Sequence, residues 1–136
     1  MFPQHLPDYI KGEIAIEAQE LAGNASDDVE GIDRQDFYSG VLYAVAHMDL
    51  DAATGDGDVK ITVYEDEESG GSYTDEVTSE TFTIDHDDDA LLEIDLDLKS
   101  NKRYLKVEVE GEEGASDTIT ISGVLVLGGA VDKPVS

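Results

Sequence analysis

The segment from Lys102 to Gly128, KRYLKVEVEGEEGASDTITISGVLVLG, decides the fold class of this chain. Apolar and polar residues alternate up to Glu110, and after a turn-rich break the alternation resumes and ends at Gly123. Because a period of two is typical of a strand with one buried face, we predict a β-hairpin here. From Val124 to Leu127 every residue is apolar, so both faces of that stretch need cover. Either another part of this chain or another protein supplies that cover.

The segment from Phe37 to Asp51 has the same two-sided apolar character. One face of the expected strand carries Leu42, Ala44 and Ala46, and the other face is apolar as well. We infer that this strand and the strand that ends in residues 124–127 are central neighbours, or that both lie under a partner.

Further segments with a period of two are residues 9–18, 59–64, 81–85 and 92–98. For residues 13–21 a helix is the alternative, since Ala, Glu, Gln and Leu are good helix formers. Residues 23–36 and 65–76 are predicted to be acidic loops. Many short strands with loops between them indicate an all-β, antiparallel β-sandwich of jelly-roll type with about eight strands and an extended N-terminal arm. We assign residues 1–36 to this arm and an acidic segment, 37–130 to the sandwich and 131–136 to a C-terminal tail.

Charge narrows the range of functions. The chain has 136 residues, of which 33 are acidic and 8 basic, and its net charge is −25. Such a chain repels nucleic acid and anionic membranes, so neither is an expected partner. At about 1 M salt the Debye length falls to about 3 Å, which screens the repulsion, and the composition therefore indicates a halophile. No apolar run approaches the roughly 18–20 residues of a membrane span, no secretory signal is expected, and without cysteine no disulfide forms.

The sequence contains no familiar catalytic motif. Its three histidines, at positions 5, 47 and 86, follow no metal-binding or triad spacing, so we expect a protein that is not an enzyme. Divalent cations are the better chemical candidate, because Asp85, Asp87, Asp88 and Asp89 offer the hard oxygen ligands that Ca²⁺ or Mg²⁺ prefers. Further aspartates surround a glycine-containing turn between residues 49 and 58. A solvated acidic loop is the alternative for both groups.

Two apolar features predict protein partners. The N-terminal arm contains prolines, which favour extended structure, and its large side chains are Phe2, Leu6, Tyr9 and Ile10. The second face of the two apolar strands cannot be buried in one sandwich, because each strand has only one inner side. We therefore predict a homo-oligomer, either a dimer or a trimer, whose interface consists of Val41, Tyr43, Val45, Val124 and Val126.

Three polar or aromatic side chains receive specific predictions. Arg103 is expected to pair with carboxylates, and the pair can be bidentate. Tyr104 is expected to cover the outer side of the sheet. Tyr73 is the aromatic residue expected to be exposed in a loop.

The order of four segments resembles that of the small capsid cement, or head-decoration, proteins of tailed phages. These segments are VLYAV, GDVKITVYED, KRYLKVEVE and ITISGVLVLGG, with a Gly/Ser loop after the second, and they cover residues 39–129. The resemblance implies a jelly-roll domain that oligomerises, binds the major capsid protein and lies on the outer surface of an icosahedral capsid. Together with the acidity, it implies a structural virion protein of a tailed virus of haloarchaea. From its apolar side chains, the arm is expected either to insert into the shell or to cross to a neighbouring subunit. The acidic N-terminal segment departs from the pattern.

Two other functions stay open. One is a calcium- or carbohydrate-binding β-sandwich module on the surface of a halophile, and the other is a tail component of a virion. A carbohydrate-binding module needs exposed aromatic rings, and a chain with no Trp and with Tyr73 as its one loop candidate offers few of them.

Overall fold

A computed structural model describes residues 10–22, 26–48, 57–84, 89–98, 101–112 and 118–130. These residues contain eight strands and no helix, so no described helix is long and apolar enough to cross a membrane. The strands are β1 (Lys11–Ala22), β2 (Ser26–Asp33), β3 (Phe37–Met48), β4 (Gly57–Asp66), β5 (Asp75–Ile84), β6 (Asp89–Asp97), β7 (Tyr104–Glu112) and β8 (Thr118–Ala130).

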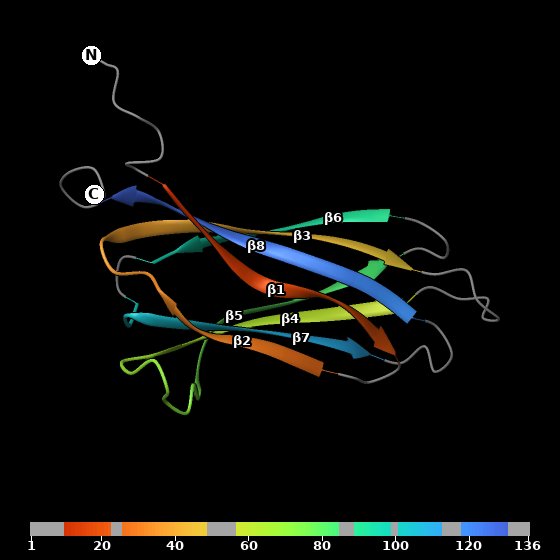
Figure 1. Ribbon diagram of the computed structural model, residues 1–136, viewed down its shortest axis with the longest axis horizontal. Helices are drawn as coiled ribbons and strands as arrows, with labels where there is room; N and C mark the ends of the chain where they lie inside the picture. Colours follow the sequence, from red (N-terminus) through yellow and green to blue (C-terminus); the bar gives the residue numbers. More distant parts are fainter. Residues whose placement is uncertain are drawn as a thin grey trace, which may run out of the picture.

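Two four-stranded antiparallel sheets, with strand orders β1-β8-β3-β6 and β2-β7-β4-β5, lie face to face as two layers (Figure 1). The first strand pairs with the last, and β3 lies between β8 and β6. This order, in which the chain crosses repeatedly from one sheet to the other, is that of a jelly roll. The predicted fold class is therefore confirmed, as is the prediction that the strands containing Val41 and Val126 are central neighbours, since these two residues are register partners.

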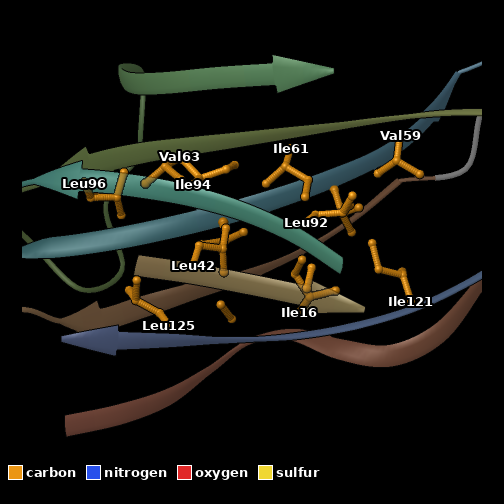
Figure 2. Packing of buried hydrophobic residues seen from close by; sticks show 14 of the residues in the cluster. Ile16, Leu42, Val59, Ile61, Val63, Leu92, Ile94, Leu96, Ile121 and Leu125 are labelled. Atoms are coloured by element: carbon orange, nitrogen blue, oxygen red, sulfur yellow. The ribbon is translucent and has the colours of Figure 1, made fainter. Parts of the chain in front are cut away.

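The core lies between the inner faces of the two sheets (Figure 2). Period-two alternation directs Val59, Ile61 and Val63 of β4 inward, where they meet Leu42 of β3 and Leu125 of β8 from the other sheet. All of them are almost completely buried. Burial of such a side chain is worth about 1.5–3 kcal/mol, which is why the alternating pattern is a dependable signal for these strands.

The predicted hairpin of residues 102–128 is wrong, because β7 and β8 belong to different sheets. Leu105 of β7 and Leu125 of β8 both point into the core, but they reach it from opposite layers. An alternating pattern states that one face of a strand is buried and leaves open which sheet holds that strand. Two consecutive strands on opposite sides of one core therefore have the same pattern as the two arms of a hairpin.

The sandwich begins at Lys11, so the predicted boundary at residue 37 is corrected. Residues 11–22 form a strand, as favoured over a helix, and register shifts after Ile14 and Ile16 explain its weak alternation. Residues 26–33 form β2 instead of part of a loop. This edge strand turns only Val29 and Ile32 towards the core, and a register shift interrupts it around Gly31, whose φ is 75°. Residues 1–9 and 131–136 lie outside the described residues.

Candidate protein-binding surface

The outer face of the β1-β8-β3-β6 sheet brings the predicted interface residues together. Tyr43 pairs in register with Val124, and Val41 pairs with Val126. Val45, Val124 and Tyr43 are 57%, 45% and 37% exposed, whereas Val41 and Val126 are half-buried. The structure therefore places all five side chains on one surface and leaves three of them exposed to solvent. Their contact with another chain stays a prediction.

A groove of about 320 Å³ opens on this face, and we call it the outer groove. Its lining comes from three adjacent strands and consists of Ile14, Ile16, Ala18, Tyr43, Val45, Ser122, Gly123 and Val124. Ile14, which is 63% exposed, was not predicted to belong to this surface. It is the register partner of Val124, and the irregular pairing of β1 beyond it hides that relation in the sequence.

The outer groove is lined by β1, β3 and β8, of which β1 contains Lys11, Glu13, Glu17 and Glu20. Neither β3 nor β8 contains an Asp, Glu, Lys or Arg residue, although 33 acidic and 8 basic residues occur in the whole chain. The neighbouring edge strand β6 contains acidic residues on this face. Its exposed Glu93 is the register partner of Tyr43, and its exposed Asp95 is the register partner of Val41. Between them and Asp89 stands Leu91, which is 69% exposed. An uncharged surface with an acidic border is therefore built into this sheet.

The outer face of the other sheet is polar and serves as a comparison. There Lys106 of β7 pairs with Asp28 of β2 at 3.3 Å, and its ammonium lies 5.6 Å from the centroid of the Tyr64 ring. Thr62 and Ser79 share a hydrogen bond of 3.2 Å between their hydroxyl groups. The absence of Asp, Glu, Lys and Arg is thus a property of the two central strands β3 and β8 and does not follow from the fold itself.

The predicted arm and cation site lie mostly outside the described residues. Of the arm, Phe2, Leu6 and Tyr9 are outside, and Ile10 is half-buried close to Gly128 of β8.

Of the aspartate cluster, Asp85, Asp87 and Asp88 are outside, and the Asp89 carboxylate lies 2.7 Å from Nδ1 of His47. Among the residues that the structure describes, no three His, Asp or Glu side chains are grouped to hold a metal ion. The cation site therefore stays a prediction.

Tyr73, predicted to be exposed, is only 3% exposed. Its hydroxyl donates a hydrogen bond to the Ser69 carbonyl oxygen at 2.6 Å and accepts one from the Gly31 amide at 3.0 Å. The Asp66 carboxylate accepts the Tyr73 amide at 3.1 Å and the Glu68 amide at 2.9 Å, and these hydrogen bonds lower the pKa of Asp66. Burial raises the pKa of the Tyr73 hydroxyl. This ring fixes the loop between β4 and β5, so it is not available to stack on a sugar.

Arg103 forms the bidentate ion pair that the sequence allowed. Its Nε and Nη2 atoms lie 3.1 Å and 2.9 Å from the two carboxylate oxygens of Asp33. The hydrogen bond from Arg103 is the main cause that lowers the pKa of Asp33. The Arg103 guanidinium also lies 5.0 Å from the centroid of the Tyr104 ring, which is half-buried.

Arg34 binds the backbone of the same end of the sandwich. It donates to the carbonyl oxygens of Lys102 at 2.9 Å and Phe37 at 3.3 Å, and also to that of Asn101. Because these contacts connect the turn before β3 to the turn before β7, this end is held by hydrogen bonds, and its cationic groups are engaged within the chain.

No protein-family profile matches the sequence, and no characterised protein matches it by sequence comparison. Similar folds occur among solved structures. Dimeric latent PorU from Porphyromonas gingivalis has a TM-score of 0.57 at 9% identity over 88% of this chain, which spans 12% of PorU. The CBM36-1 domain of a multidomain xylanase from the hindgut metagenome of Trinervitermes trinervoides has a TM-score of 0.57 at 10% identity, with 89% of this chain and 100% of that domain covered.

A third similar structure is the CBM22-1 xylan-binding domain from Paenibacillus barcinonensis, with a TM-score of 0.53 at 14% identity, covering 90% of this chain and 83% of that one. At such low identities the likeness concerns the fold and does not extend to ligands. The described residues therefore form an eight-stranded jelly roll of the general shape that these proteins share.

Proposed function

We propose that this chain is a structural virion protein that binds the outer surface of an icosahedral capsid, made by a tailed virus of a halophilic host, and stabilises or decorates it. The observation that carries the proposal is the uncharged outer face of β3 and β8 in a chain of net charge −25. An exposed sheet face without charge lowers the solubility of a protein, and contact with another protein offsets this loss by covering the face. The resemblance in strand order supplies the capsid as the partner.

High salt favours an apolar interface over an ionic one. At molar salt the Debye length is about 3 Å, so exposed ion pairs contribute little while apolar burial keeps its strength. Ile14, Val45 and Val124 are between 45% and 63% exposed. Burying what remains of these three side chains contributes roughly 2–5 kcal/mol, taking about 1.5–3 kcal/mol for each full burial. This free energy per copy is enough to support attachment when many copies bind the same shell.

The test is association with capsids. Purified virions should contain this chain in a fixed ratio to the major capsid protein, and shells stripped of it should bind it again at about 3 M KCl. Val124→Asp places a carboxylate on the uncharged face and should weaken rebinding at least tenfold. Thr81→Asp adds the same charge at an exposed site on β5, in the other sheet, and should rebind like the parent. A parent chain that does not bind stripped shells would refute the proposal.

A further inference from the structure

We infer that the outer groove is filled by residues 1–9 of a second copy of this chain. The inference rests on the proposed function for its setting, in which copies are neighbours on a shell, and it names the occupant of the outer groove. The groove is one part of the uncharged face, and Val41 and Val126 lie outside it. Its grounds are the chemistry of the groove, the composition of these nine residues, the position of Ile10 and the charges that border the groove.

The outer groove is suited to an apolar segment. Its volume of about 320 Å³ is at the lower end of the range of roughly 300–1,000 Å³ that is usual for ligand pockets. Ile14 and Val45 are more than half exposed, and the remaining lining comes from Ile16, Tyr43, Val124 and small residues, without any charged side chain. A charged occupant would lose hydration here and find no counter-charge.

Residues 1–9, MFPQHLPDY, have the matching composition. They include Met1, Phe2, Leu6 and Tyr9 as large apolar side chains, and Asp8 is their one carboxylate in a chain with 33 acidic residues. Two prolines restrict the backbone to extended conformations, which lowers the entropy lost when such a segment is ordered on a surface. Among the termini and loops of this acidic chain, this segment is chemically adapted to an uncharged groove.

The chain reaches the sandwich at the sheet that carries the groove. Ile10 lies against β8, with its Cγ2 atom 3.8 Å from the position of a Cβ on Gly128, and Lys11 begins β1. Nine extended residues span at most about 30 Å, whereas Ile14 is only about 14 Å further along the strand than Ile10. A neighbouring copy whose β1 lies near the groove can therefore place Phe2 and Leu6 in it. To fill its own groove, the chain would have to reverse direction immediately before Lys11, which is already paired with Leu127.

The bordering charges favour this arrangement over direct stacking of two sheets. Face-to-face stacking of this surface would bring the exposed carboxylates of Glu93 and Asp95 of two copies into one interface. Neither β3 nor β8 contains a Lys or Arg residue that could neutralise them. An arm with a single carboxylate covers the apolar side chains and keeps the two acidic bodies apart.

The experiment is a complementation between two full-length variants at about 3 M KCl, followed by light scattering. The first, Phe2→Asp with Leu6→Asp, has a disabled arm, and the second, Val45→Asp, has a disabled groove. Each alone should have the mass of a monomer, whereas the parent should be an oligomer. A mixture of the two should associate, because the second variant still supplies an arm and the first a groove. In the mixture a single arm–groove contact joins two chains, whereas several such contacts hold together a closed oligomer of the parent. The concentration at which half of the chains are associated should therefore be at least roughly tenfold higher for the mixture than for the parent.

Leu91→Asp is the matched control, because Leu91 is exposed, is the register partner of Val45 and does not line the groove. It should keep the mass of the parent. A fluorescent peptide of residues 1–9 should bind the arm-disabled variant and not the groove-disabled one. All variants are compared by thermal melting, and since the substituted residues of the sandwich are solvent-exposed, each should melt cooperatively.

Several results would overturn the inference. An arm-disabled variant that keeps the mass of the parent would show that another contact holds the copies together. A mixture that stays monomeric although the peptide binds would show that an arm attached to one copy does not reach the groove of another. A monomeric parent would exclude exchange between copies. Binding of the variants to stripped shells is measured separately. Normal shell binding without arm exchange would refute the arm inference and leave the proposed function intact. Arm exchange without shell binding would refute the proposed function and leave the arm inference intact.

Discussion

Replacing Tyr73 with phenylalanine tests whether this residue is a structural anchor or an exposed ring for ligands. Phenylalanine keeps the ring and its packing but removes the hydroxyl that donates to the Ser69 carbonyl at 2.6 Å and accepts from the Gly31 amide at 3.0 Å. Two backbone groups then lose their partner beside a side chain that is 3% exposed. An unsatisfied buried polar group typically costs about 1–3 kcal/mol. We therefore expect the melting temperature to fall by about 3–12 °C for a chain of this size.

Circular dichroism at about 3 M KCl measures the effect, with chemical denaturation as a second probe. Tyr38→Phe is the control, since Tyr38 is exposed and the same chemical change then occurs at the surface. Its melting temperature should match that of the parent. If Tyr73→Phe also melts like the parent, the hydroxyl does not hold the loop between β4 and β5, and the reasoning is refuted. A role in carbohydrate stacking would predict that outcome, because phenylalanine stacks on sugars without any hydroxyl.

Four further predictions concern packing, salt, acid and cations. Gly123→Ala should lower the free energy of unfolding, measured by chemical denaturation, by about 1–3 kcal/mol, because the new Cβ would stand 2.9 Å from the Tyr43 carbonyl oxygen. Unchanged stability would contradict this close approach of β8 to β3. The melting temperature should be lower at about 0.1 M than at about 3 M KCl, because the Debye length shortens from about 10 Å to about 3 Å or less, and equal values would exclude adaptation to salt. The pKa of Asp33 is lowered in the folded state, so its ionised carboxylate stabilises the fold above the unfolded pKa, and this stabilisation is lost as the pH falls through the folded pKa. Asp33→Asn should therefore melt at a lower temperature than the parent at pH 6, and the difference between the two melting temperatures should disappear below about pH 4. If the acidic cluster binds Ca²⁺, EDTA should lower the melting temperature of the parent but not that of the double variant Asp87→Asn with Asp89→Asn. A parent whose melting temperature does not respond to EDTA would show that the cluster is a solvated acidic loop.

The strands that the sequence predicted are those whose apolar residues alternate without interruption. In β4 and β6 every second residue enters the core, so the period of two is complete. In β2 and in the first part of β5 the pattern fails, because few of their side chains turn towards the core and register shifts interrupt their pairing. Such segments are held largely by backbone hydrogen bonds to one neighbour, and the sequence carries little trace of those. The edge strand β6 keeps its alternation because Leu92, Ile94 and Leu96 enter the core.

The candidate surface was partly predictable for a related reason. Val41, Tyr43 and Val45 share a parity opposite to that of the core residues of β3, and parity alone is enough to assign them to an outer face. Ile14 lies on a strand whose register shifts between Ile14 and Ile16, so parity cannot be followed through it. The groove itself depends on that irregularity, because Ile16 lines it while being buried.

The two-sided apolar stretch of residues 124–127 posed a choice between cover from this chain and cover from another. Leu125 and Leu127 are completely buried in the core, so this chain covers one side. On the other side Val124 remains 45% exposed, next to Val45 at 57%, and no described segment lies over them. A strand at the centre of a sheet needs no apolar outer face for its own stability, because its hydrogen bonds and its core side are already satisfied. In a chain with 33 acidic residues, an outer face without charge over two adjacent strands is the observation on which the proposed contact with another polypeptide rests.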